Sequence, residues 1–402
     1  MGSIDSYFKR IGWFEVKDLD RSIRKSFKTS QAESLIDEWE KLCSARDENK
    51  EQGLSKENVS RQSEIVDFTH SSLKMSLLFS SYYDLDVYKQ FFEAVEKRKD
   101  FFGKNIIEYG CGNGIITCYL AMMLPDRVLC GVDVSENAIR IANILKDKLK
   151  LKNVGFYNSD NIPDFKYDTL VSVRTFHENI STLWTNASYY SFEKQLKTNS
   201  SLYDQYIKQL SNLLNPTGNL IAFERGKQMH FVEISESCKR NGINPILQEC
   251  EFHKCIEASE ERDLFLLCAS KSVETYSYDQ LIGFIYEEYP YGYSGAYAEF
   301  ILEKIKGLLI DAFISVDDKE TICGIHALYN NAADYSKFIL FQKNKLNCTT
   351  QIFDKLEDMD EAEELMKESR KNDQLSGFKL FDTNSDYQLQ TLIEYLNKTD
   401  KQ

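Results

Sequence analysis

The spacing of apolar positions changes twice along the chain and divides it into three regions. From residue 1 to about 100, polar residues dominate, and the apolar ones recur at helical spacing, most densely over 71–99. We therefore predict a helical N-terminal region over residues 1–100. Its many aromatic side chains need a neighbouring domain to pack against.

In the second region, residues 101–271, short apolar runs alternate with amphipathic stretches. This alternation predicts parallel strands joined by helical crossovers. The predicted strands lie at 105–109, 128–133, 154–158, 168–173 and 219–224. Two further apolar runs, 246–259 and 262–270, are separated by only a few charged residues, so we expect an antiparallel hairpin to close one edge of the sheet.

The third region, residues 272–402, has the pattern of a separate α+β domain. Residues 278–313 combine helix-like stretches with a Tyr/Gly-rich loop. Strands are predicted at 325–330, 337–342, 349–354 and 377–382, and helices at 358–371 and 386–396. We expect this domain to recognise the substrate or to form a homodimer.

Composition narrows the classes of partner. The 402 residues include 49 Lys+Arg and 63 Asp+Glu, a formal net charge of −14. Nucleic acid is bound mainly through basic side chains, so it is disfavoured as a partner. Apolar runs fall short of the roughly 20 residues that cross a bilayer, and the ten cysteines are scattered. We expect a cytoplasmic protein with free thiols and no membrane association.

The strongest local signal is the turn that follows the first predicted strand. Glu108 precedes three glycines at alternate positions, Gly110, Gly112 and Gly114, and a helix follows them. Glycines there allow positive φ and close approach of a ligand to the backbone, while the helix start presents free N–H groups. The turn by itself indicates a nucleotide-like ligand.

Two details separate the alternatives. The spacing is GxGxG rather than the GxGxxG of dinucleotide enzymes, and the Glu108 carboxylate suits a cationic sulfonium better than a pyrophosphate. The alternative interpretations are that the chain is a nicotinamide-dependent oxidoreductase, or that these glycines form a tight turn that binds no ligand. At this point the sequence resembles the class I S-adenosylmethionine-dependent methyltransferase family, whose first motif has this form.

The resemblance continues in register for roughly 170 residues. It implies a seven-stranded, mostly parallel methyltransferase sheet with S-adenosylmethionine as co-substrate. Asp133, with Val134 beside it, ends the second strand, where the family places an acid that holds the ribose hydroxyls. Asp160 and Asn161 follow the third strand, where the family recognises adenine. The N-terminal region is then expected to act as a lid over the donor and substrate.

Candidate catalytic residues follow the fourth strand, where family members place residues that face the substrate. His177 could act as the base toward a hydroxyl, although a histidine just beyond a strand is often structural. Arg174 could orient a carboxylate acceptor. Glu178 could orient His177 or face the donor.

Missing motifs narrow the acceptor. The fourth motif lacks an Asn-Pro-Pro-Tyr-type tetrapeptide, and no Pro-Cys nucleophile occurs in the sequence. We therefore predict O-methylation, on a hydroxyl or carboxylate, of a small molecule or peptide. The alternatives are N-methylation of a protein or peptide, and a non-catalytic protein that binds the donor.

A metal site is not predicted. Cys250, His253 and Cys255 lie close together in the sequence, but strand alternation places Cys250 on the face opposite the other two.

Overall fold

The structure is a computed structural model. It describes residues 4–51, 64–176, 179, 192–277, 280–281, 284–285, 293–294, 307–315, 322–329, 335–343, 348–353 and 378–380. Contacts divide the chain into two units, one of residues 1–183 with 200–275 and one of residues 184–199 with 276–402. The first unit thus contains both the N-terminal helices and the glycine turn.

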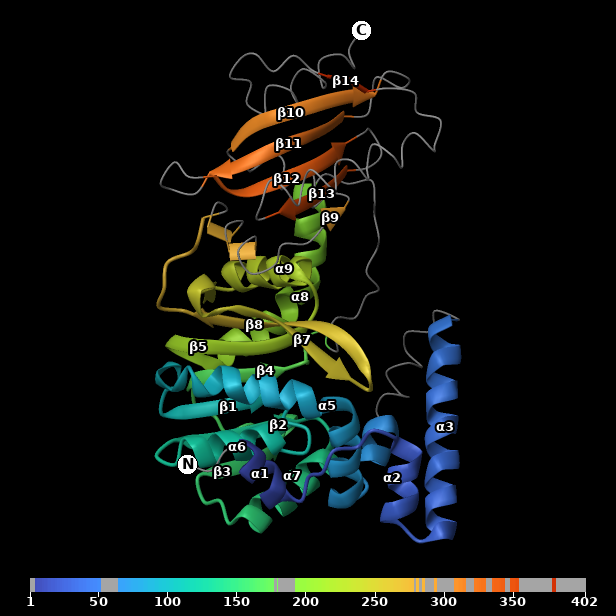
Figure 1. The fold of residues 1–402 in the computed structure, drawn as a ribbon. Helices are drawn as coiled ribbons and strands as arrows, with labels where there is room; N and C mark the ends of the chain where they lie inside the picture. The colour runs from blue at the N-terminus through green and yellow to red at the C-terminus, as the bar shows by residue number, and fades with distance from the viewer. Residues whose placement is uncertain are drawn as a thin grey trace. The chain divides into compact units, whose positions relative to one another are not determined.

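An eight-stranded sheet forms the centre of the first unit, with its strands in the order β3-β2-β1-β4-β5-β8-β6 and with β7 paired to β8 (Figure 1). The strands from β3 to β5 are mutually parallel, and β8 runs antiparallel to β5. The strands are β1 (Asn105–Tyr109), β2 (Val128–Asp133), β3 (Val154–Asn158), β4 (Tyr167–Val173), β5 (Leu214–Arg225), β6 (Asn244–Pro245), β7 (Glu251–Glu257) and β8 (Glu260–Ser270). The predicted class of fold and its five parallel strands are confirmed.

Helices complete the first unit and explain the amphipathic stretches between strands. They are α1 (Ile4–Ile11), α2 (Leu19–Ser26), α3 (Thr29–Glu51), α5 (Leu73–Glu96), α6 (Ile115–Met123), α7 (Glu136–Leu149), α9 (Gln228–Arg240) and residues 200–213 of α8 (Phe192–Leu213), whose first residues, 192–199, are grouped with the second unit. α6 is buried along almost its whole length, whereas α7 buries one stripe and begins at the Ser135 N-cap. Among the helices in the described ranges, none has the length and apolarity to cross a membrane.

The edge of the sheet differs from the predicted seven strands. The expected hairpin is present as β7 and β8, and its turn residues Ala258 and Ser259 both have positive φ, 49° and 69°. Positive φ at both residues is typical of a two-residue hairpin turn, whose twist matches that of the two strands it joins. The outer strand is broken, however: β6 and β7 both pair with β8, and a short 3-10 helix (Leu247–Glu249) separates them. The break raises the count to eight.

Helix α5 lies along β7 and satisfies backbone groups of that strand. The carboxylate of Asp86 accepts a hydrogen bond from the Ile256 N–H (2.8 Å), and the Gln90 side-chain amide donates to the Lys254 carbonyl (2.7 Å). The aromatic ring of Phe92 stacks on Tyr119 of α6 at a centroid distance of 3.8 Å. The N-terminal aromatics therefore pack on the sheet and its helices.

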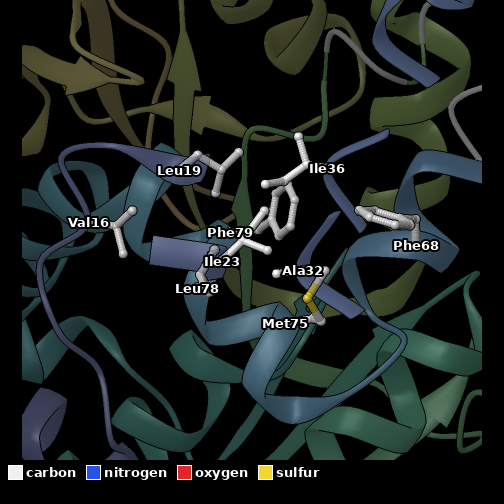
Figure 2. Packing of buried hydrophobic residues seen from close by; sticks show 9 residues of the cluster. All are labelled: Val16, Leu19, Ile23, Ala32, Ile36, Phe68, Met75, Leu78 and Phe79. Atoms are coloured by element: carbon white, nitrogen blue, oxygen red, sulfur yellow. The ribbon is translucent and has the colours of Figure 1, made fainter. Parts of the chain in front are cut away.

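A hydrophobic cluster joins α2, α3 and the N-terminal half of α5, with Val16 and Phe68 from the segments before α2 and α5. In Figure 2 its side chains point toward one another. The cluster comprises Val16, Leu19, Ile23, Ala32, Ile36, Phe68, Met75, Leu78 and Phe79. The short amphipathic helix α2 and the first turns of α3 are therefore held by packing on α5 rather than by helix propensity alone.

The second unit contains a six-stranded sheet in the order β14-β10-β11-β12-β13-β9, all pairs antiparallel. Its strands are β9 (Tyr293–Ser294), β10 (Gly307–Ser315), β11 (Ile322–Tyr329), β12 (Tyr335–Lys343), β13 (Cys348–Phe353) and β14 (Phe378–Leu380). The four predicted strands are confirmed. The helix-like prediction is wrong for 307–313, which belong to β10 and pair with two neighbouring strands. The helices predicted at 358–371 and 386–396 lie outside the described residues.

Candidate active site

The glycine turn has the backbone that the sequence requires. Gly110, Gly112 and Gly114 have φ values of 80°, 50° and 76°, all in the left-handed region that favours glycine. The Gly110 N–H donates to the Val132 carbonyl (2.8 Å), which fixes the turn to the end of β2. Gly114 is the N-cap of α6. The turn therefore brings the start of α6 beside the carboxyl ends of β1 and β2.

The three glycines differ in their surroundings. A Cβ on Gly110 would lie 2.5 Å from Thr175 Cγ2, and one on Gly114 would lie 2.7 Å from the Phe156 ring. A Cβ on Gly112 would meet no atom within 4 Å. Gly110 and Gly114 are thus required by packing, whereas the space at Gly112 is open to a ligand.

We expect Gly112→Ala to weaken binding of the donor by roughly tenfold, because the added methyl group projects into the ligand space. Its cost to folding should be about 1 kcal/mol, which is the strain of a left-handed alanine. Gly114→Ala is the matched control and should instead destabilise the fold by about 2 kcal/mol through its clash with Phe156. Calorimetric titration with S-adenosylhomocysteine and urea denaturation measure the two effects. If donor affinity fell in the same proportion to stability in both variants, this division of roles would be contradicted.

Asp133 and Val134 lie next to this open space. The two carboxylate oxygens of Asp133 accept hydrogen bonds from the Gly112 N–H and the Ser135 N–H, both at 2.9 Å. Each oxygen keeps a lone pair for a further donor. Val134 is 77% exposed, a large value for an apolar side chain, and its carbonyl accepts from the Asn158 side chain. A carboxylate and an apolar surface are thus presented side by side after β2.

Asp160 and Asn161 lie in a short 3-10 helix (Ser159–Asn161) directly after β3. Both side chains are exposed, and the Asp160 N–H donates to the Asn158 side chain (3.1 Å). Because β3 pairs in parallel with β2, these residues emerge at the same edge of the sheet as Asp133. The predicted cofactor residues are therefore at neighbouring strand ends.

Glu108 is in a different environment from Asp133. Its side chain is only 2% exposed, and it accepts a hydrogen bond from the Thr117 hydroxyl of α6. Burial, and to a smaller extent the negative charge of Asp133, raise the pKa of the Glu108 carboxyl to about 8, against the opposing hydrogen bonds from Thr117. The carboxyl is consequently protonated at neutral pH in the unliganded protein.

Helix α5 supports the glycine turn through residues that the motif analysis did not select. The Asn113 side-chain amide donates to the hydroxyls of Ser76 and Ser80, at 2.8 and 2.9 Å. These serines, with Asp84, recur every four residues in a largely apolar helix and so share one face. That i, i+4 row was the available signal in the sequence.

The guanidinium of Arg174 is held by two carboxylates. It lies 2.7 Å from Asp84 of α5 and 2.9 Å from Glu257 of β7, and Glu257 also contacts Arg225 at 2.8 Å. Burial alone would lower the pKa of Arg174, but Asp84 and Glu257 raise it above its ordinary value. Its buried Nε has no hydrogen-bond partner among the described residues. Arg174 has a φ of 57°, so the chain turns sharply there.

A buried carboxylate shapes the loop that follows. Glu224 on β5 is fully buried, and its two oxygens accept from the N–H groups of Thr175 (3.1 Å) and Phe176 (3.2 Å). The Thr175 hydroxyl bonds the hydroxyl of Tyr206 on α8 (2.6 Å). Glu224 therefore fixes the backbone leading to the predicted catalytic residues. His177 and Glu178 themselves lie outside the described residues, so their roles stay predictions.

Metal-ligating side chains do not gather in the part of the chain that the structure describes: no three His, Cys, Asp or Glu residues converge there. Cys250 is buried with its thiol directed at the Ile246 carbonyl. His253 contacts Gln90 (3.1 Å), and burial lowers the pKa of its imidazole.

Comparison with known proteins identifies the domain. Residues 101–278 match the family model described as "Methyltransferase domain". A release factor glutamine methyltransferase of Fusobacterium nucleatum is 31% identical over 131 residues, 30% of this chain and 37% of that protein. The putative methyltransferase 235L of Invertebrate iridescent virus 6 is 29% identical over 132 residues, 33% of this chain and 48% of that protein. The matches thus span less than half the length of either relative.

A solved structure, that of a SAM-dependent methyltransferase from Aquifex aeolicus, is 20% identical and covers 44% of this chain and 89% of that one, with a TM-score of 0.31. The family match begins just before β1 and ends just after β8, so it contains the glycine turn and the strand ends described above. Residues 101–278 therefore belong to the methyltransferase domain family with the class I fold, and their co-substrate is S-adenosylmethionine.

Proposed function

We propose that the whole chain transfers a methyl group from S-adenosylmethionine to a side chain of a peptide or protein. The open space at Gly112, next to the Asp133 carboxylate and the exposed Val134, carries the donor half of this proposal. Asp133 would accept hydrogen bonds from the ribose hydroxyls, Val134 would contact the adenine, and Asp160 and Asn161 would recognise its amino group. Glu108 would lose its proton when the cationic donor binds and would then supply negative charge.

Methyl transfer from a sulfonium requires alignment of donor and acceptor more than activation of the donor. The fixed backbone at Thr175 and Phe176 suits such alignment, because Glu224 satisfies both N–H groups and removes their freedom. The loop that continues to His177 and Glu178 would therefore place the acceptor. His177 would take the proton, and Glu178 would orient it.

The ion pairs of Arg174 bear on the chemistry of the acceptor. Because Asp84 and Glu257 neutralise its guanidinium, it is poorly suited to bind a carboxylate acceptor. The similarity to a release factor glutamine methyltransferase points the same way. N-methylation of an amide is thus our first candidate, and O-methylation of a hydroxyl by His177 is the second.

The remaining parts of the proposal concern the protein's setting. We assign the second unit to acceptor recognition or homodimerisation, the N-terminal helices to a lid over the donor, and the protein to the cytoplasm without a nucleic-acid partner.

Asp133→Asn tests the donor site. We expect the variant to bind S-adenosylmethionine and S-adenosylhomocysteine about tenfold more weakly, since it loses charge-assisted hydrogen bonds to ribose. Asp147→Asn, an exposed acid on α7, is the control and should bind normally. Calorimetry measures both, and NAD should not bind to either protein. Unchanged affinity in Asp133→Asn would overturn the donor assignment.

The acceptor class is tested with a radiolabelled methyl donor and peptide libraries. A methyl ester is released by alkali, whereas an N-methyl amide and a methyl ether are not. If the label resists alkali and peptides without glutamine are not labelled, the result supports methylation of an amide. Donor binding without methyl transfer to peptide, protein or small-molecule acceptors would favour a non-catalytic binding protein.

A further inference from the structure

An open cavity of about 390 Å³ lies among the N-terminal helices, apart from the residues assigned above to the donor. Its walls come from the start of α2, from α3 and from α5. Three aromatic side chains line it, Trp39, Tyr82 and Tyr83, together with the charged residues Lys17, Asp18 and Asp20.

The aromatic walls are steeply inclined to one another rather than stacked. The Tyr82 and Tyr83 rings are 4.9 Å apart at 84°, and the Trp39 and Tyr83 rings are 6.3 Å apart at 63°. Trp39 is anchored from behind by Phe79, whose ring centroid is 4.7 Å away. A ligand in the cavity would therefore meet preformed aromatic surfaces that lose little conformational entropy on binding.

The charges at the cavity favour a cation. The cavity is lined by two carboxylates, Asp18 and Asp20, and one ammonium, Lys17. The Lys17 ammonium also forms an ion pair with Glu15 (3.5 Å). The positive end of the α2 dipole is offset by Asp18, which accepts from the Arg21 N–H (2.9 Å). Aromatic faces combined with carboxylates are the surroundings that organic cations prefer.

We propose that this cavity binds a basic side chain, lysine or arginine, of a peptide partner. The cavity opens to solvent, so it can take a side chain whose backbone remains outside. The net charge of −14 favours approach of a basic peptide. Binding here does not depend on methyl transfer and is measured without the donor.

The test is a ligand-observed NMR titration of the full chain with short capped peptides that contain lysine, arginine, norleucine or glutamate. The lysine and arginine peptides should bind, and norleucine should bind roughly tenfold more weakly, because it lacks the cation–π and ion-pair contacts. Binding should also weaken as salt is raised. No binding of either basic peptide, or equal binding of norleucine, would overturn the proposal.

Variants that should change the affinity for the basic peptides in opposite directions test whether binding occurs at this cavity. Asp18→Ser/Asp20→Asn removes both carboxylates while serine keeps the α2 cap, and it should weaken binding severalfold. Lys17→Gln removes a competing cation and should tighten binding about twofold. Asp126→Asn, an exposed acid in another turn, should leave binding unchanged. Tighter binding of the glutamate peptide than of the basic peptides, and its weakening in Lys17→Gln, would show an anion site instead.

Discussion

At pH 8.5 the variant Glu108→Gln is expected to be roughly 4 kcal/mol more stable to unfolding than the unmodified protein, and at pH 5 only about 1 kcal/mol more stable. Burial and the negative charge of Asp133 raise the pKa of the Glu108 carboxyl from its ordinary 4.5 to about 8 in the folded state. Between these values the unfolded chain has released a proton that the folded chain keeps. The stability contributed by that proton is therefore present below pH 4.5 and is lost as pH rises to about 8.

Glutamine has nearly the same shape and carries no proton to lose, and its amide oxygen can still accept from Thr117. Urea denaturation at several pH values between 5 and 8.5 measures the difference. Glu38→Gln, an exposed acid on α3, is the control and should follow the unmodified protein. Parallel pH curves for Glu108→Gln and the unmodified protein would show that Glu108 is ionised in the folded state throughout. On the proposed function, this lost stability is the cost of keeping a carboxylate near a cationic donor.

The second large effect concerns Arg174. Arg174→Met should lower the free energy of unfolding by about 3 kcal/mol, because Asp84, whose side chain is 13% exposed, loses the guanidinium that neutralises it. Arg225→Met is a closely matched control: it removes the other arginine on Glu257, but Arg225 is 49% exposed. Its loss should therefore cost no more than about 1 kcal/mol.

Denaturation of both variants and of Asp84→Asn/Arg174→Met checks this reasoning. The double variant should recover part of the stability lost in Arg174→Met, since it no longer buries an unpaired carboxylate. Equal losses in Arg174→Met and Arg225→Met would mean that burial does not set the strength of these ion pairs.

The parallel strands were predictable because each is a short, continuous apolar run between amphipathic stretches, as in β4, where six of seven residues are buried. β10 was not, because only Gly307 separates it from the helix-like stretch before it, and the apolar residues on both sides of that glycine read as one amphipathic run. The break between β6 and β7 was also invisible: it depends on pairing with β8, and apolar spacing does not record which residues pair.

For the site, local motifs were informative and long-range partners were not. The glycine turn and Asp133 belong to neighbouring strand ends, so their meeting follows from parallel topology alone. The partners of Arg174 lie 90 and 83 residues away in the chain, on a helix and on an edge strand. Nothing in the residues around position 174 could reveal that its charge is neutralised. The same holds for Glu224, whose role depends on the register of β5 against β4.

The hydrogen bonds from α5 to the edge strand β7 also determine which segment of the chain can fold by itself. Asp86 and Gln90 occupy backbone groups of a strand that lies more than 160 residues later in the sequence. A truncated chain of residues 101–278, the segment matched by the family model, would keep every strand of the sheet but uncover this edge, together with the ring of Tyr119 that Phe92 covers. An unpaired edge beside newly exposed aromatic surface invites strand-to-strand association. The boundary of sequence similarity is therefore not the boundary of the folding unit, which begins at the N-terminal helices.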